Sequence, residues 1–163
     1  GILLHDRIAV ESTRTGMFFS ILGLLTGMMW AKFTWGTFWT KDPKLNAAAI
    51  AMLIYTAYMI LRDAIADEDK RARITAVYNI FAFPAFMALI YIMPRLTDSL
   101  HPGNGGNPGF NGYDRDHQMN MIFYSSIIGF ILLGTWITTL RIRLRMWADK
   151  KDGLIIDTKK HDS

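Results

Sequence analysis

The stretch "TGMFFSILGLLTGMMWAKF", residues 15–33, holds a single charged side chain, Lys32, near its end. About 20 apolar residues in a helix are long enough to cross a bilayer. Three further stretches are similar in length and character: residues 46–61 ("NAAAIAMLIYTAYMIL"), 74–93 ("ITAVYNIFAFPAFMALIYIM") and 119–140 ("MNMIFYSSIIGFILLGTWITTL"). Because hydrocarbon offers backbone amides no hydrogen-bond partner, each stretch must be helical. The sequence therefore predicts an all-α, multi-pass membrane helix bundle with four transmembrane helices in this chain.

The rest of the composition agrees with a membrane protein. Of the 163 residues 51% are hydrophobic, and they collect into the four blocks instead of being spread along the chain. A soluble domain with four such blocks would have little polar chain left to cover them. Gly23, Gly27, Gly129 and Gly134 favour close helix packing, and Pro84 is expected to kink the third helix. The absence of cysteine excludes disulfides, thiolate metal sites and covalent thioether attachment of haem.

The positive charges predict the orientation in the membrane. Lys and Arg are concentrated in residues 62–73 ("RDAIADEDKRAR") and after residue 140 ("RIRLRMWADKK"), which fall on one side of the bundle. Cytoplasmic flanks carry the excess of positive charge, so this side is expected to be cytoplasmic. An aromatic segment after the first span and a turn-rich link at residues 95–118 then share the outer face.

The aromatic segment "WAKFTWGTFWTKDP" occupies residues 30–43. Tryptophan and tyrosine commonly sit at headgroup level, and such an aromatic belt is one interpretation. The other is a flat apolar platform for a porphyrin or quinone, on which rings stack and a glycine lets the backbone approach closely. The residues alone leave both interpretations open. Both interpretations concern the same five rings and the glycine between them: Trp30, Phe33, Trp35, Gly36, Phe38 and Trp39.

Polar candidates lie on the same outer face. His101 follows the third span, and although a loop histidine is most often solvated, imidazole is also the usual ligand of haem iron. His117, in "DRDHQ", has a setting typical of solvent, and His5 and His161 lie on the cytoplasmic flanks. Asp42 precedes Pro43 and is interpreted as the N-cap of the second helix. Three cations are either solvated or could pair with carboxylates such as haem propionates: Lys41, Lys44 and Arg95.

The segment "LTGMMWAKFTWGTFWTKDPKLNAAAIAMLIYTAY" resembles the tryptophan-rich WWD domain of haem-handling membrane proteins, and most closely the CcmC family of cytochrome c biogenesis. "DSLHPG" around His101 resembles the Leu-His segment of that family. Ala31, Phe38 and Lys41 depart from the family pattern, Phe38 and Lys41 standing in place of tryptophan. The positions that fall on the pattern in register are Trp30, Trp35, Gly36, Trp39, Asp42, Lys44 and Leu45. The resemblance implies His101 as a haem-iron ligand, with the other cofactor-binding residues being Trp30, Trp35, Gly36, Phe38, Trp39 and Asp42.

The resemblance also implies a function. A CcmC-like protein would bind haem b non-covalently, present it at the periplasmic face of the bacterial cytoplasmic (inner) membrane and pass it to the haem chaperone CcmE. Such a protein is a haem transporter or delivery protein more than a conventional enzyme. Its partners would be membrane lipid and the maturation subunits CcmA, CcmB and CcmD, with no nucleic acid. Two alternatives stay open: a cytochrome c synthetase subunit of the CcsA type, and a structural membrane subunit without haem.

The expected organisation follows the family. Residues 1–145 would form the CcmC-like membrane domain, with the tryptophan-rich segment at 27–46 and a periplasmic loop at 94–118, and residues 146–163 would form a cytoplasmic tail. The family resembles a six-helix protein with a second haem-ligating histidine near its second helix. No residue here matches that histidine, so we expect the chain to lack the first two helices.

Overall fold

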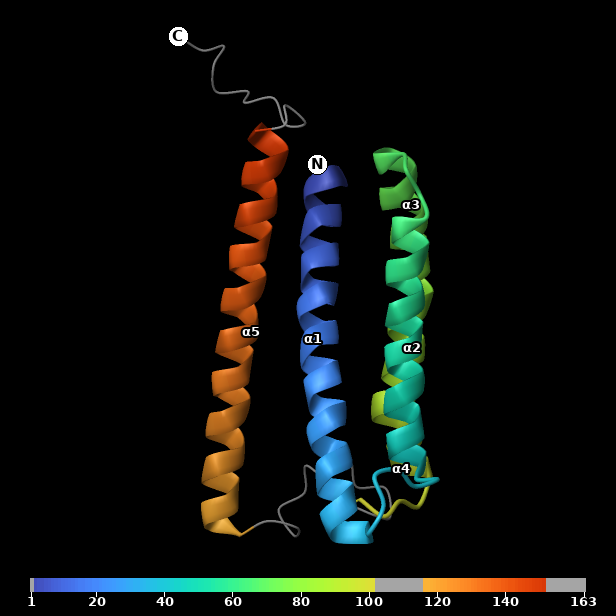
Figure 1. The fold of residues 1–163 in the computed structure, drawn as a ribbon, viewed down its shortest axis with the longest axis vertical. Coiled ribbons are helices and arrows are strands. Elements are labelled where there is room, and N and C mark those ends of the chain that lie inside the picture. The colour runs from blue at the N-terminus through green and yellow to red at the C-terminus, as the bar shows by residue number, and fades with distance from the viewer. Residues whose placement is uncertain (1, 102–115, 152–163) are drawn as a thin grey trace.

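The computed structural model describes residues 2–101 and 116–151, and these are helical with short links (Figure 1). The helices are α1 (Ile2–Trp35), α2 (Pro43–Asp63), α3 (Glu68–Met87), a π-helical turn η1 (Ala88–Ile92), the short α4 (Met93–Leu96) and α5 (His117–Lys151). Four helical segments are long and apolar enough to cross a membrane: Leu4–Trp35, Pro43–Asp63, Glu68–Leu96 and His117–Lys151. The predicted all-α, four-span bundle is confirmed.

The helices stand side by side, with α1 in the middle (Figure 1). α5 packs on one flank of α1, and α2 and α3 pack on each other and on the opposite flank. The beginning of α1, the end of α5 and the link between α2 and α3 lie at one end of the bundle. The links that carry the aromatic segment and His101 lie at the other. We call these the ionic end and the aromatic end.

Large side chains face outward along most of the bundle. Phe81 is 73% exposed and Leu132 65% exposed, whereas small residues such as Ala47, Ala51 and Ala72 are buried between helices. This inversion suits helices that pack through small side chains and present large ones to lipid. The predicted role of the glycines is only partly seen. A Cβ added at Gly134 would meet Phe19 of α1 at 3.5 Å, but at Gly23, Gly27 and Gly129 it would meet no atom of the described part of the chain within 4 Å.

The helices extend beyond the predicted spans at the ionic end. α1 begins at Ile2, so Asp6, Arg7 and Glu11, which precede the predicted span at residues 15–33, lie within the helix and are buried. α5 runs through Lys151, so the proposed boundary at residue 145 falls inside this helix. The cause is ion pairing between helices: Arg7 Nε lies 2.8 Å from an oxygen of Asp149. Carboxylates opposite arginines let these turns continue without leaving buried charges unpaired.

Pro84 lies inside α3, as predicted, and the irregularity associated with it is a π-helical turn that begins at Ala88. A proline removes one backbone donor and crowds the preceding turn, and a π-helical turn is one way for a helix to absorb a local misfit. Of the loop expected at 94–118, the first residues belong to α4 and the last begin α5, while residues 102–115 lie outside the described part.

Candidate functional site

The aromatic end brings together side chains that are far apart in sequence. Trp30 and Trp35 come from the last turns of α1, Asp42 from the link before α2, and Ser99 and His101 from the segment after α4. Ser99 Oγ donates to Asp42 Oδ2 at 2.7 Å across 57 positions of sequence. The site is therefore built by tertiary folding, although each of its parts is a short local motif.

Asp42 is the centre of this arrangement. Its carboxylate accepts hydrogen bonds from Lys44 N (3.0 Å), Leu45 N (3.3 Å), Ser99 Oγ (2.7 Å) and Leu100 N (2.6 Å), and it lies 3.0 Å from His101 Nδ1. The first two bonds are those of an N-cap, so the predicted capping role is confirmed. The same side chain also ties the third segment to α2.

The environment keeps Asp42 ionised. Burial by itself would raise the pKa of this carboxyl, because it disfavours the charged form. The hydrogen bonds from Ser99, Leu100 and Leu45, together with the neighbouring His101, outweigh burial and lower the pKa of Asp42 below its ordinary value. A buried carboxylate surrounded by donors can act only as an acceptor.

This carboxylate decides the tautomer of His101. Asp42 accepts, so the hydrogen in the neutral imidazole must lie on Nδ1, 3.0 Å from Asp42 Oδ1. Nε2 then carries the lone pair. Carboxylate–histidine pairs of this kind hold metal-ligating imidazoles in place and increase their basicity. Nε2 is thus the nitrogen of His101 whose chemistry allows it to bind a metal.

Two tryptophans pack against the imidazole. The Trp35 ring lies edge-on to His101 with centroids 4.8 Å apart, and the Trp30 ring is tilted at 6.0 Å. Trp30 and Trp35 also pack edge-to-face on each other at 5.0 Å. The His101 side chain is still 31% exposed, so it is positioned but accessible.

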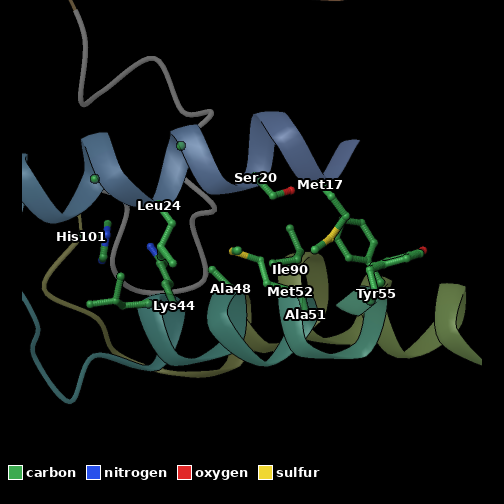
Figure 2. Close-up of a pocket in the computed structure, with 14 residues that line it drawn as sticks. Met17, Ser20, Leu24, Lys44, Ala48, Ala51, Met52, Tyr55, Ile90 and His101 are labelled. Atoms are coloured by element: carbon green, nitrogen blue, oxygen red, sulfur yellow. The ribbon is translucent and has the colours of Figure 1, made fainter. Parts of the chain in front are cut away.

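A cavity of about 360 Å³ opens beside His101, between α1 and α2 (Figure 2). His101 and Lys44 lie at one end and Tyr55 at the other, with Leu24 of α1 and Met52 of α2 between them. Its wall is mostly apolar, which suits a flat apolar ligand that carries polar groups along one edge. The other lining residues are Met17, Ser20, Gly23, Gly27, Leu45, Ala48, Ala51, Phe86 and Ile90.

The other three rings of the aromatic segment, Phe33, Phe38 and Trp39, are exposed. Phe33 is 84% exposed, as expected for a belt side chain. Lys32 Nζ lies 5.5 Å from the centre of the Phe38 ring. Among the described residues, the ring contacts of His101 are with Trp30 and Trp35. The segment thus holds two rings that contact the histidine, of which Trp30 is itself 43% exposed, and three exposed rings without such a contact among the described residues.

Gly36 has a structural role in the backbone, at the end of α1. Its φ is +79°, a region that residues with a side chain rarely adopt, and its N–H donates to Lys32 O at 3.1 Å to close α1. A Cβ there would meet no atom of the described residues within 4 Å, so this part of the protein does not require the close approach suggested by the sequence. The glycine turns the chain from α1 toward Asp42.

The three candidate cations are placed differently. Lys44 lines the cavity, whereas Lys41 is exposed. The Arg95 guanidinium lies 3.7 Å from the centre of the Tyr91 ring. His117 is the exposed first residue of α5, and His5 lines a separate cavity near the ionic end. Within residues 2–101 and 116–151, no cluster of three or more His, Asp or Glu could hold a metal ion.

Sequence reasoning missed several residues of this site. Nothing distinguished Ser99, because a serine in a loop carries no signal of its own. Ala48, Met52 and Tyr55 follow helical spacing on α2, which indicates a common face but not that the face lines a cavity.

Comparison with known proteins gives the family. Residues 2–156 match the family model described as "Heme exporter protein C" (CcmC). This chain belongs to the CcmC family. Curated relatives include Heme exporter protein C of Rhodobacter capsulatus, 29% identical over 147 residues (85% of this chain and 57% of the relative). The Haemophilus influenzae protein of the same name is 27% identical over 137 residues (80% of this chain and 52% of the relative).

A second group of relatives is named Cytochrome c biogenesis protein CcsA. The protein from Prochlorococcus marinus subsp. pastoris is 36% identical over 76 residues, which is 47% of this CcmC-family chain and 24% of the relative. The chain spans about half the length of the Heme exporter protein C relatives above (57% and 52%).

Proposed function

We propose that this CcmC-family chain binds haem at its aromatic end and hands it on during cytochrome c maturation. The single observation that carries the proposal is the orientation of His101. A buried, ionised Asp42 fixes this imidazole, Trp30 and Trp35 flank it, and an apolar cavity opens beside it. The family name and the name of the Rhodobacter capsulatus relative supply the class of cargo, which is haem.

The residues present fit this cargo. Haem has two apolar faces, an iron that takes imidazole nitrogen and two propionate carboxylates. His101 Nε2 is the nitrogen available to iron, and Trp35 and Trp30 offer apolar rings around it. The wall of the cavity accepts the apolar edge of the macrocycle, and the Lys44 ammonium at its head is the cation positioned for a propionate.

Binding through one imidazole and apolar contacts is reversible, which suits a protein that delivers its cargo. The chain has no cysteine with which to form a thioether bond. In this proposal haem b stays non-covalent, the aromatic end faces the periplasm according to the distribution of Lys and Arg, and the recipient is the chaperone CcmE. CcmA, CcmB and CcmD are the proposed partners in the bacterial inner membrane.

The second candidate is a cytochrome c synthetase subunit of the CcsA type, favoured by the likeness to CcsA proteins over 76 residues. Both candidates use haem and therefore share the site described above. They differ in the product: a synthetase forms thioether bonds on apocytochrome c, whereas an exporter leaves haem loaded on a chaperone. Assaying both products from one purified preparation separates them.

The test of haem binding uses the full-length protein in detergent. His101→Ala should strongly reduce the Soret band after purification from haem-supplemented cells, and His117→Ala should leave the band unchanged. His117 is a suitable control because it is exposed and begins α5. A His101→Ala protein with the parental absorption spectrum and haem content would refute the assignment of His101 as a ligand.

A further inference from the structure

A small cavity of about 160 Å³ with a predominantly charged wall lies at the ionic end, separate from the cavity that His5 lines. Side chains of α1, α2, α3 and α5 line it, so it lies where all four long helices meet. We call it the arginine cavity. Its lining residues are Arg7, Val10, Glu11, Arg14, Arg62, Asp63, Arg71 and Arg145.

Two of the arginines, Arg62 and Arg7, are held in place by carboxylates that do not line the cavity. Arg62 forms a bidentate pair with Asp6, through Nη1 at 2.6 Å and through Nη2. Arg7 pairs with Asp149 at 2.8 Å and with Glu68 at 3.0 Å. These contacts fix the planes of the guanidinium groups before any ligand arrives.

The wall that faces the cavity remains positive. Five arginines line it, against the carboxylates of Glu11 and Asp63. Both oxygens of Glu11 are already engaged, one by Arg14 Nη1 at 2.7 Å and the other by Arg141 Nε at 2.8 Å. The carboxylates outside the cavity thus neutralise part of the cluster, while arginines outnumber carboxylates on its inner wall.

One donor in this wall has no partner within residues 2–101 and 116–151. Arg71 pairs with Glu68 through Nη2 at 2.8 Å, but its Nε is buried and makes no hydrogen bond to that part of the chain. A buried donor of this kind is uncommon, because it has lost water without gaining an acceptor. Arg71 lines the arginine cavity, so an anion bound there would lie beside a side chain with an unused donor.

We propose that the arginine cavity binds a phosphate group. Planar guanidinium groups recognise tetrahedral phosphate through paired N–H donors, which a preorganised set of arginines provides. The cavity lies at the ends of the spanning helices, beside the end of α2 at Asp63 and the start of α3 at Glu68. This is headgroup level whichever way the chain is oriented, so an anionic phospholipid headgroup and a soluble phosphate are the two sources of this chemistry.

The experiment measures phosphate binding to the full-length protein without using haem. Thermal unfolding in detergent is followed by tryptophan fluorescence while inorganic phosphate replaces chloride at constant ionic strength. In a parallel arm, native mass spectrometry counts adducts of phosphatidylglycerol and of phosphatidylcholine with matched chains. Stabilisation by inorganic phosphate indicates a site open to soluble phosphates, whereas retention of phosphatidylglycerol alone indicates a headgroup site.

Matched variants decide whether the arginine cavity is responsible. Arg71→Gln and Arg14→Gln each remove a lining guanidinium, and Arg73→Gln removes the same charge from an exposed position of α3 outside the cavity. We expect at least a tenfold loss of phosphate or phosphatidylglycerol affinity in both lining variants and none in Arg73→Gln. Arg14 is 38% exposed in its side chain, so its replacement tests the site even if Arg71→Gln folds poorly. The proposal fails if phosphate and chloride act alike and phosphatidylglycerol shows no preference, or if Arg73→Gln loses as much affinity as Arg14→Gln.

Discussion

Replacing Asp42 by asparagine tests whether this carboxylate positions the haem ligand. Asparagine is as good an N-cap as aspartate, so the start of α2 keeps its cap. It has only one acceptor oxygen, however, whereas Asp42 receives donors on both: Lys44 N, Leu45 N and His101 Nδ1 on Oδ1, and Ser99 Oγ and Leu100 N on Oδ2.

The cost follows from that count. With the amide oxygen kept at the Oδ1 position, its NH₂ group faces the Ser99 hydroxyl, which can rotate and accept, and Leu100 N–H, which cannot. The part-buried N–H of Leu100 therefore loses its acceptor, which costs about 1–3 kcal/mol of folding free energy. The bond to His101 also changes from charge-assisted to neutral, at about half its strength. We expect Asp42→Asn to destabilise the protein by about 2–4 kcal/mol.

Haem binding should respond separately from stability. Loss of an ionised partner of a metal-ligating histidine reduces metal affinity by roughly 10–100-fold. Asp42→Asn should weaken haem binding in that range, measured by haem titration of the full-length apoprotein, and raise the ferric–ferrous midpoint potential, because a less basic imidazole stabilises ferric iron less. Asp98→Asn is the matched control, an exposed carboxylate near His101. Parental haem affinity and potential in Asp42→Asn would refute the positioning role.

Three further outcomes are expected. Trp35→Ala should weaken haem binding by roughly 10-fold through loss of its ring contacts with Trp30 and His101, whereas Phe33→Ala, at an 84% exposed ring, should leave the haem titration unchanged. Gly36→Ala should lower the free energy of unfolding by about 1–2 kcal/mol, measured by denaturation, because φ at this position is +79°. Folding lowers the pKa of Asp42 from 3.8, so the stabilising effect of this carboxylate is complete above pH 3.8 and is lost as pH falls through the lower folded pKa. Unfolding temperatures recorded between about pH 5 and 2 should show this loss of stability. The Asp42→Asn protein should lose less stability over the same range.

The sequence predicted the parts of this molecule that depend on local pattern. Four apolar stretches gave the spans, since the hydrocarbon core imposes both length and helical structure. Asp42 before Pro43 gave the start of α2, since capping depends on neighbours in sequence. Segment 30–43 and His101 were also assigned to one end of the bundle, because each lies in a link on the same side.

What the sequence could not predict depends on distant contacts. The ring pairs join α1 to a segment more than 60 residues later, so spacing did not show that Trp30 and Trp35 contact His101 while Phe38 and Trp39 stay exposed. The predicted first span began only at residue 15, because a single sequence does not show that Arg7 meets Asp149, 142 positions away. Charged residues near a membrane span are read as solvated until a partner is known.

The double role of Asp42 connects the fold to the proposed delivery of haem. The carboxylate that caps α2 through Lys44 N and Leu45 N is the one that orients His101. The proposed ligand histidine is therefore held in place relative to a membrane helix, although it lies in a link. Lys44, in the first turn of that helix, lines the cavity beside His101. A shift of the α2 start relative to α1 would therefore move the imidazole, the cation and the cavity wall together. In the proposed function, such a shift would loosen several contacts to haem in one step, which suits a protein that binds its cargo reversibly.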